Sequence, residues 1–314
     1  MEECSIMRIK NIIKHPEKSF FVLQKHGLLD FLPDDVYLKW MYKAYMGKSL
    51  NLKNPATFNE KLQWLKLYDR KPVYNRMVDK YEAKIFVKEK LGGDADKYII
   101  PTLGVWDKFD DIDFNKLPEQ FVLKTTHDSG TVFICKDKKN FNYSQAKNKI
   151  ERSLKYNFYS YGREWPYKNV RPRIIAEKYM ELSSPSCAEY KLFCYNGKVN
   201  WVMVCRGTAH SNNVRTNDGF DINFNHLPVK FIAQNANCNF EKPKEWEQLI
   251  SFAETLAEDT IQLRVDTYLI DGHIYFGELT FFHDSGLCPI KPEEWDAKLG
   301  ENLILPIDEK GENK

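Results

Sequence analysis

Residues 263–286 read LRVDTYLIDGHIYFGELTFFHDSG and predict two short strands joined by a tight turn. Asp271-Gly272 supplies the positive-φ residues that a two-residue hairpin turn requires, and apolar or aromatic residues flank it on both sides. Asp266 and Glu278 stand on opposite arms, so folding at this turn brings their carboxylates level. Acids among apolar neighbours must be paired, hydrogen-bonded or bound to a metal. With Thr280 as a further oxygen donor they predict a Mg²⁺ site, and the alternative is a hairpin whose acids simply face water.

A second pattern lies at residues 121–135, which read FVLKTTHDSGTVFIC and predict a strand, a loop of small polar residues and another strand. Lys124 ends the first strand, and Gly130 lies in the loop. A lysine in this place can pair as a point charge with phosphate oxygens, while loop N–H groups surround them. The pattern indicates a phosphate-binding loop, with an ordinary hairpin as the alternative.

Two further segments place charged residues on strands. Residues 174–181 read IIAEKYME, an apolar strand that ends in the charged pair Glu177-Lys178. The next predicted hairpin turns at Asn196-Gly197. Its residues Glu189 and Lys191 share one face, because side chains alternate along a strand.

The remaining frame is largely helical at its start. Residues 1–70 predict helices, one of which begins at a Thr57/Glu60 pair with capping-box spacing. A helix is expected at 80–91, a strand from 98 to 101 and an amphipathic helix at 252–263.

Aromatic and cationic side chains outside these elements supply further candidates. Residues 156–167 carry six aromatic rings, which predict either a stacking surface for sugar rings or packing inside a sub-domain. Arg206 follows a strand, and Arg215 lies in a polar loop with His210. Both arginines are candidates for binding a phosphate or a substrate carboxylate, with a solvated surface as the alternative.

Composition excludes several classes of protein. The chain has 314 residues, 43% of them apolar, which suffices for the cores of two or three sub-domains. Its 46 Lys and Arg and 44 Asp and Glu are well mixed and lack the clustered basic face of a nucleic-acid-binding protein. We expect no membrane span and no signal peptide, because the apolar runs are short. Seven cysteines without a C-x-x-C pair fit the reduced thiols of a cytoplasmic protein.

The order of these segments is similar to that of the ATP-grasp ligases, which end in R-x-D, a hairpin and E-x-[N/T]. Longer phrases, NPATFNEKLQWLKLYD, DKYEAK, LPEQFVLKTTHDSG, EYKLFCYNGKV and RVDTYLIDGHIYFGELTF, resemble the TupA-like ATP-grasp proteins, a group found with bacterial surface-polysaccharide genes. The resemblance implies an α+β fold in which two α+β sub-domains grip ATP, with a helical N-terminal extension. It divides the chain into a helical N-terminal region at 1–70, a pre-ATP-grasp segment at 71–118, a lid sub-domain at 119–180 and a catalytic sub-domain at 181–314.

The resemblance also implies a role for individual residues. ATP would be held by Lys80, Lys124, His127, Ser129, Gly130, Glu177, Lys178, Tyr179, Glu189 and Lys191. Mg²⁺ would be held by Asp266, Glu278 and Thr280. Catalytic contacts would come from Arg264, Arg206, Arg215, Ser285 and Gly286. The chain departs from the family at Thr280, where Asn is usual, at Glu189, where Asp is usual, and at His283-Asp284, where Pro-Gly is usual.

The implied reaction joins a carboxylate to an amine through an acylphosphate, with ATP and Mg²⁺ as cofactors and ADP as a product. The carboxylate would belong to a uronic acid of a capsular or other surface polysaccharide or its precursor, and the amine to an amino acid or amino alcohol. Three alternatives stay open. They are an ATP-grasp kinase, a glycosyltransferase using the D-x-D tripeptides at 94–96 or 111–113, and a carbohydrate-binding module using the aromatic stretch.

Overall fold

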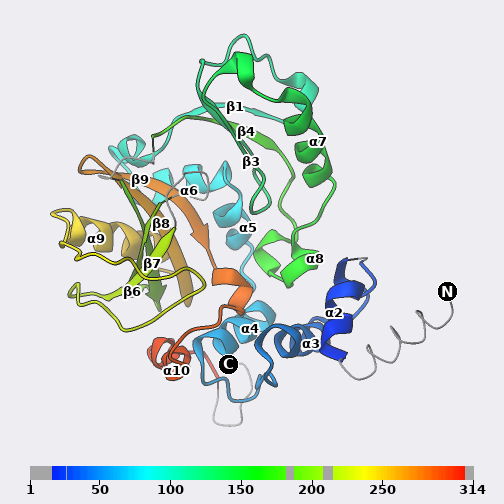
Figure 1. Ribbon diagram of the computed structural model, residues 1–314, viewed down its shortest axis with the longest axis vertical. Helices are drawn as coiled ribbons and strands as arrows, with labels where there is room; N and C mark the ends of the chain where they lie inside the picture. The colour runs from blue at the N-terminus through cyan, green and yellow to red at the C-terminus, as the bar shows by residue number, and fades with distance from the viewer. Residues whose placement is uncertain (1–15, 26, 182–186, 208–214, 308–314) are drawn as a thin grey trace.

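Two antiparallel sheets and the helices around them make up the protein (Figure 1). The computed structural model describes residues 16–25, 27–181, 187–207 and 215–307. One sheet has four strands in the order β1-β4-β2-β3, and the other has five in the order β7-β6-β5-β8-β9. Every neighbouring pair of strands is antiparallel. The predicted α+β class is therefore confirmed.

The four-stranded sheet is covered by one helix. Its strands are β1 (Thr102–Trp106), β2 (Phe121–Thr125), β3 (Val132–Cys135) and β4 (Ile174–Lys178). Helix α7 (Tyr143–Leu154) presents Ala146 and Ile150, one turn apart, to the apolar cluster that contains Phe121 and Leu123. The short 3-10 helices η2 (Phe109–Asp111) and η3 (Lys138–Asn140) lie in the connections of this sheet. Alternate residues of β2 are consequently buried, which leaves Lys124 on its other face.

The five-stranded sheet contains the hairpins that the sequence predicts. Its strands are β5 (Ala188–Tyr195), β6 (Lys198–Arg206), β7 (Thr216–Asp221), β8 (Gln262–Ile270) and β9 (His273–Thr280). The turn between β5 and β6 has positive φ at Asn196 and Gly197, and the turn between β8 and β9 has it at Asp271 and Gly272. These are the conformations that two-residue hairpin turns need.

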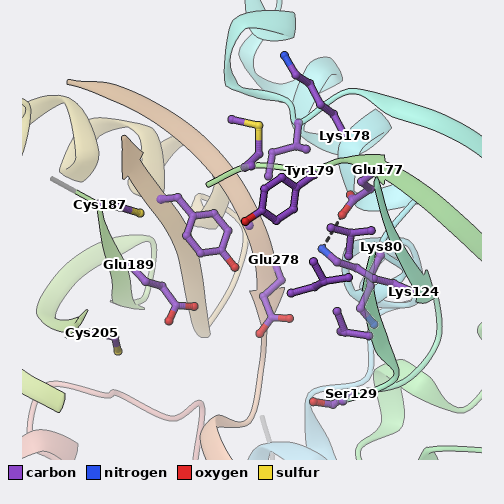
Figure 2. A pocket seen from close by; sticks show the side chains of 18 of the residues that line it. Lys80, Lys124, Ser129, Glu177, Lys178, Tyr179, Cys187, Glu189, Cys205 and Glu278 are labelled. Atoms are coloured by element: carbon purple, nitrogen blue, oxygen red, sulfur yellow. Dashed lines mark hydrogen bonds and ion pairs between the residues drawn. The ribbon is translucent and has the colours of Figure 1, made fainter. Parts of the chain in front are cut away.

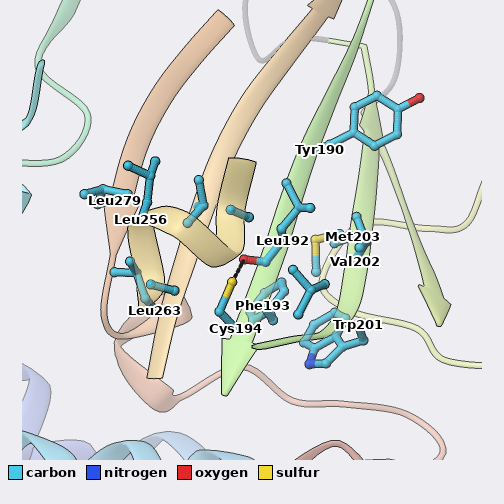
Figure 3. Packing of buried hydrophobic residues seen from close by; sticks show 14 of the residues in the cluster. Tyr190, Leu192, Phe193, Cys194, Trp201, Val202, Met203, Leu256, Leu263 and Leu279 are labelled. Atoms are coloured by element: carbon cyan, nitrogen blue, oxygen red, sulfur yellow. Dashed lines mark hydrogen bonds between the residues drawn. The ribbon is translucent and has the colours of Figure 1, made fainter. Parts of the chain in front are cut away.

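Both faces of this sheet are buried over part of its length. Leu192 of β5 and Leu263 of β8 lie beside Leu256 of α9 (Trp246–Ala257) on one face (Figure 3). On the other face Trp201 stacks on Phe193, with ring centroids 3.6 Å apart. Phe58, at the start of α4 (Phe58–Tyr68), packs edge-on against Phe193 at 6.0 Å. The N-terminal helices thus cover one end of this face, and the end that carries Glu189 and Lys191 is left for the site.

The N-terminal part is helical, as predicted. Its helices are α2 (Pro16–Lys25), α3 (Asp34–Met46), α4, α5 (Val73–Val78) and α6 (Glu82–Leu91). The predicted capping box is present, because the Thr57 side chain accepts from the Glu60 N–H at 3.2 Å and the Glu60 side chain accepts from the Thr57 N–H. Helix α10 (Glu294–Gly300) packs against α4, where the Asn59 N–H donates to Asp296 at 3.0 Å. Short elements complete the chain: η1 (Ala95–Tyr98), α8 (Tyr159–Gly162), η4 (Trp165–Tyr167) and η5 (His283–Gly286).

Two predicted elements differ from the structure. The strand expected at 98–101 is wrong, because η1 ends at Tyr98 and β1 begins at Thr102. Pro101 has no N–H for a ladder, and the apolar residues before it serve packing instead. The helix expected at 252–263 ends six residues earlier, at Ala257, because its last apolar residues belong to β8. The division at residue 118 stays a prediction, although β1 from the segment 71–118 pairs with β4.

Candidate active site

A cavity of about 290 Å³ lies between the two sheets. Figure 2 shows Glu278 between Glu189 on one side and Lys80 and Lys124 on the other. An apolar part of the wall comes from Ile100, Val122, Val132, Ile134 and Met180. Ten of the predicted site residues line the cavity: Lys80, Lys124, Ser129, Gly130, Glu177, Lys178, Tyr179, Glu189, Arg215 and Glu278. The lining thus combines an apolar part, which suits a flat apolar group, with charged side chains.

Glu177 is the most deeply buried acid of this lining, with 4% of its surface exposed. Lys124 of the adjacent strand lies 2.5 Å from one carboxylate oxygen, and Lys84 of α6 binds the other. Burial raises the pKa of Glu177, but the two lysines outweigh it and lower this pKa to about 2. Glu177 therefore carries a charge and fixes Lys124 at the wall of the cavity.

The loop after Lys124 is held by Asp128. Its carboxylate accepts hydrogen bonds from Thr125, from Thr131 at 2.5 Å and from Ser153 at 2.5 Å. Lys80 donates to the main-chain oxygen of Asp128, and its Nζ lies 3.8 Å from the carboxylate. Lys80 and the loop residues Ser129 and Gly130 thus reach the cavity together.

His127, predicted to bind ATP, points away from this cavity. It is 2% exposed, and its Nε2 lies 3.0 Å from the main-chain oxygen of Ser153 on α7. The structure therefore makes His127 part of the support for the loop.

Four predicted residues form an ion-pair chain at the five-stranded sheet. The Lys191 ammonium donates to Glu189 at 2.7 Å and also to Asp266. Arg215 donates to the other oxygen of Glu189 at 3.0 Å. Lys191 does not line the cavity, so it acts on Glu189 from behind, whereas Glu189 and Arg215 face inward.

The three predicted metal ligands all accept hydrogen bonds from the guanidinium group of Arg264. Arg264 is 6% exposed and binds both oxygens of Asp266, at 2.6 and 2.8 Å. The Nη2 atom of Arg264, which makes the 2.8 Å bond to Asp266, also donates to Glu278 at 2.9 Å and to Thr280 at 3.0 Å. Asp266 and Glu278 stand opposite each other in the β8–β9 ladder, as the hairpin predicted. Burial raises the pKa of Glu278, but Arg264 and nearby lysines lower it to about 2, so this acid is charged.

The three predicted metal ligands offer oxygen atoms, but Arg264 occupies the point on which these atoms converge. Oxygen atoms of two carboxylates and one hydroxyl converge within 3.0 Å of one positive nitrogen, and oxygen is the donor that Mg²⁺ prefers. Glu278 lines the cavity, and 48% of its side chain is exposed. Asp266 is 1% exposed, and both its oxygens accept from Arg264. Of the three predicted ligands Glu278 is therefore the one that reaches the cavity, Thr280 donates to Glu278 at 3.1 Å, and Asp266 orients the arginine.

Arg264 also fixes the protonation of His283. Its Nη1 lies 2.8 Å from His283 Nδ1, and a guanidinium group can only donate, so Nδ1 accepts and Nε2 carries the proton. Burial keeps the ring neutral by lowering the pKa of His283 well below its usual value. His283, Asp284 and Cys288 lie close enough to surround a metal ion. The protonated Nε2 has no free lone pair, however, so the described residues of this cluster do not make a metal site.

The predicted catalytic residues Ser285 and Gly286 lie in η5 and do not line the cavity. Lys66 of α4 donates to both the main-chain oxygen and the hydroxyl of Ser285, each at 2.8 Å. Gln63 donates to the main-chain oxygen of Gly286 at 2.8 Å. In this structure both residues are engaged by the N-terminal helix.

The structure does not bring Arg206 to the site. Its guanidinium lies over the ring of Phe240, 4.4 Å from the centroid, and donates to the sulfur of Cys238. His210, which the sequence placed beside Arg215, lies outside the described residues.

The aromatic stretch at 156–167 mainly packs inside the protein. Tyr159 is 7% exposed and donates to Asp34, and Tyr167 packs against the main core. Tyr156 and Tyr161 remain more than 40% exposed. Of the two interpretations of this stretch, packing accounts for the buried rings.

Sequence reasoning missed Lys84, Asp128 and Lys66. Lys84 stands four positions after Lys80 in the phrase DKYEAK, a spacing that in a helix would place both on one side and so signals a second lysine, although α6 itself begins at Glu82. Asp128 lies among hydroxyl residues, a pattern typical of a carboxylate that organises a loop. Lys66 carries no sequence signal, because its partners lie about one hundred or more positions away.

Within the described ranges, no helix combines the length and the apolar character that crossing a bilayer requires. The sequence model of the TupA-like ATPgrasp family matches residues 60–304. No curated protein matches the chain.

Two of the solved structures similar to this one are ligases of low sequence identity. A D-alanine–D-alanine ligase from Bacillus anthracis, complexed with ATP, is 16% identical over 65% of this chain and 55% of its own, with a TM-score of 0.38. An L-amino acid ligase from Bacillus licheniformis is 12% identical over 88% of this chain and 58% of its own, with a TM-score of 0.42. The matched part thus spans less than two thirds of either ligase.

Proposed function

Because the chain belongs to the TupA-like ATP-grasp family, as the match over residues 60–304 shows, we propose that it is an ATP-dependent ligase that joins a carboxylate to an amine. The observation that carries the proposal is that Lys80, Lys124, Glu189 and Glu278 line the same cavity between the two sheets. Two lysines can neutralise phosphate oxygens there, and the apolar end can take an adenine ring.

The reaction has two steps. A substrate carboxylate oxygen attacks the γ-phosphorus of ATP, which forms an acylphosphate and releases ADP. The nitrogen of the amine then attacks the acyl carbon, an amide forms, phosphate leaves and the amine loses a proton. Negative charge develops at the phosphoryl group and then at the acyl oxygen, so fixed cations near both places lower the barriers.

The residues of this chain have distinct roles in that scheme. Lys80 and Lys124 bind phosphate oxygens, and Arg264 stabilises negative charge beside Glu278. Glu278, with Thr280 beside it, would hold Mg²⁺, and the ion would supply charge neutralisation when bound. Asp266 holds Arg264 in a fixed orientation through two hydrogen bonds. Glu189, held between Lys191 and Arg215, is placed to accept from the ribose hydroxyls.

For the substrates we propose a uronic acid of a capsular or other surface polysaccharide, or its precursor, and an amino acid or amino alcohol as the amine. The reaction would take place in the bacterial cytoplasm, where ATP is available. The choice of substrates follows the resemblance to proteins found with bacterial surface-polysaccharide genes, and Arg215, which faces the cavity and suits a carboxylate, supports an acidic substrate.

Two alternatives are weaker. The D-x-D tripeptides that a glycosyltransferase would use lie at η1 and η2, outside the cavity lining, where Asp96 pairs with Lys88 and is 82% exposed. A kinase would use the same ATP cavity but transfer the phosphoryl group to a hydroxyl.

The test is a turnover assay with the purified protein, ATP, Mg²⁺ and a panel of uronic acids crossed with amines. ADP and phosphate formed only when both acid and amine are present would support the ligase. ADP without phosphate would indicate a kinase. Binding of a nucleotide sugar without ATP turnover would refute the proposal in favour of a glycosyltransferase.

A further inference from the structure

The turn that follows strand β9, at residues 284–286, has an unusual backbone. Asp284, Ser285 and Gly286 are three consecutive residues with positive φ, of 45°, 56° and 63°. Residues other than glycine rarely adopt this backbone conformation, and it persists only where the surrounding structure enforces it. The contacts that enforce it are therefore as informative as the turn itself.

Helix α4 supplies those contacts. Gln63 and Lys66 are three residues apart on one side of α4 and both have 0% exposure. The Lys66 ammonium donates to the Ser285 main-chain oxygen and hydroxyl, each at 2.8 Å, and Gln63 donates to the main-chain oxygens of Ser285 and Gly286 at 2.9 and 2.8 Å. A side chain at position 286 would come within 2.5 Å of Gln63, so only glycine allows this approach.

Glu164, just before η4, balances the buried charge of Lys66. It is 6% exposed, and its Oε1 atom and the Ser285 hydroxyl border the same point, 2.9 and 2.4 Å from where a Cβ at Gly162 would lie. Burial lowers the pKa of Lys66 to about 7, and the charge of Glu164 opposes that shift. Ser285 thus joins a buried lysine and a buried acid that come from different segments of the chain.

The turn at 284–286 also orients Arg264, the arginine to which we assign a catalytic role. His283, the first residue of η5, accepts a hydrogen bond from Arg264 at 2.8 Å, and its ring packs edge-on against Phe193 at 5.3 Å. Arg264 donates to Glu278 at the cavity. A continuous set of contacts therefore runs from α4 through the turn and His283 to the predicted site of charge development.

We propose that Lys66 and Glu164 are positioning residues, which hold the turn at 284–286 so that His283 fixes Arg264 beside Glu278. Neither residue lines the cavity, so neither touches the nucleotide. The inference rests on the proposed function, and it makes the N-terminal helical region part of the catalytic machinery rather than a separate covering layer.

The variant that tests this proposal is Lys66→Met with Glu164→Gln. Removing both charges together avoids leaving one of them buried and alone, which would destabilise the fold by itself. Lys61→Met is the matched control, because Lys61 lies on the same helix and also donates to two main-chain oxygens, those of Gly300 and Leu303 at 2.8 and 2.9 Å, away from the turn.

We expect the double variant to lose about 10²-fold in kcat, the order of effect of a misplaced catalytic group, with the KM for ATP within about threefold of wild type. Lys61→Met should keep its kcat. An unchanged kcat in the double variant would overturn the proposal. So would an equal loss in both variants, because that would show a general effect of weakening α4.

A crystal structure of the double variant separates this proposal from the proposed function. If wild-type protein turned over ATP with no acid and amine, the proposed function would fail, yet the structure would still decide the positioning role. A turn that leaves its positive-φ conformation, with loss of the hydrogen bond between Arg264 and His283, supports the proposal. An unchanged turn and arginine overturn it. If the double variant does not fold, Gln63→Leu, which removes two bonds to the same turn without changing a charge, is measured in the same way.

Discussion

Glu177 offers a quantitative test of the electrostatics of the cavity. Its carboxylate is 4% exposed and pairs with Lys124 at 2.5 Å and with Lys84. Replacing it with Gln removes the charge and leaves both lysines without their acid. We therefore expect Glu177→Gln to destabilise the folded protein in a way that depends strongly on pH.

The magnitude follows from the pKa of Glu177, which falls from 4.5 to about 2 on folding because the two lysines outweigh burial. At about 1.4 kcal/mol per pKa unit, the pairing contributes about 3 kcal/mol to the free energy of unfolding. A carboxyl group whose pKa is lowered stabilises the fold above its unfolded pKa of 4.5, and this contribution is lost as the pH falls through about 2. At pH 3 about 2 kcal/mol of it should already be gone.

The assay is urea-induced unfolding of the wild-type protein and Glu177→Gln at pH 7, 5 and 3. We expect a difference of about 3 kcal/mol at pH 7 that shrinks to about 1 kcal/mol at pH 3. The control is Glu89→Gln, because Glu89 pairs with Arg76 at 2.9 Å while 55% of its side chain is exposed, and such pairs contribute about 1 kcal/mol or less. An equal difference between wild type and Glu177→Gln at pH 7 and pH 3 would refute the assigned ion pairs.

Three further substitutions test other parts of the structure. Glu278→Gln removes the cavity carboxylate that Arg264 holds and should abolish ATP turnover while the protein stays folded, as circular dichroism would show; a fully active variant would refute the metal assignment. Gly277→Val places a Cβ 3.0 Å from the main-chain oxygen of Asp266, so we expect weaker ATP binding by titration calorimetry, and unchanged affinity would mean that the backbone yields easily. Thr57→Ala removes the capping box of α4 and should lower the free energy of unfolding by about 1 kcal/mol; no loss in urea unfolding would contradict the cap.

Local patterns made the hairpins and the helix cap predictable from the sequence. Asp271-Gly272 and Asn196-Gly197 accept positive φ, so the two turns, and with them the pairing of Asp266 with Glu278, followed from residues near in sequence. The capping box of Thr57 depends on a spacing of three residues.

The partners of buried charges could not be predicted in the same way. Lys66 meets Ser285, 219 positions later, and Lys124 meets Glu177, 53 positions later, because packing of whole elements brings them together. The sequence also did not predict where the Arg206 side chain points, because its guanidinium lies over the ring of the distant residue Phe240 and away from the cavity. The strand expected before Pro101 shows that apolar residues alone do not specify a strand.

The contact between α4 and the end of the chain has a consequence for folding during synthesis. The Asn59 side chain donates to the main-chain oxygen of Cys288, 229 positions later. At roughly 5–20 residues per second, a ribosome needs about 10–45 s to make the intervening chain. During that time the face of α4 that carries Gln63 and Lys66 lacks the turn it binds in the native protein. The turn at 284–286 can close on α4 only after this part of the chain has been made, so we expect the buried amide and ammonium groups of Gln63 and Lys66 to stay in water until then.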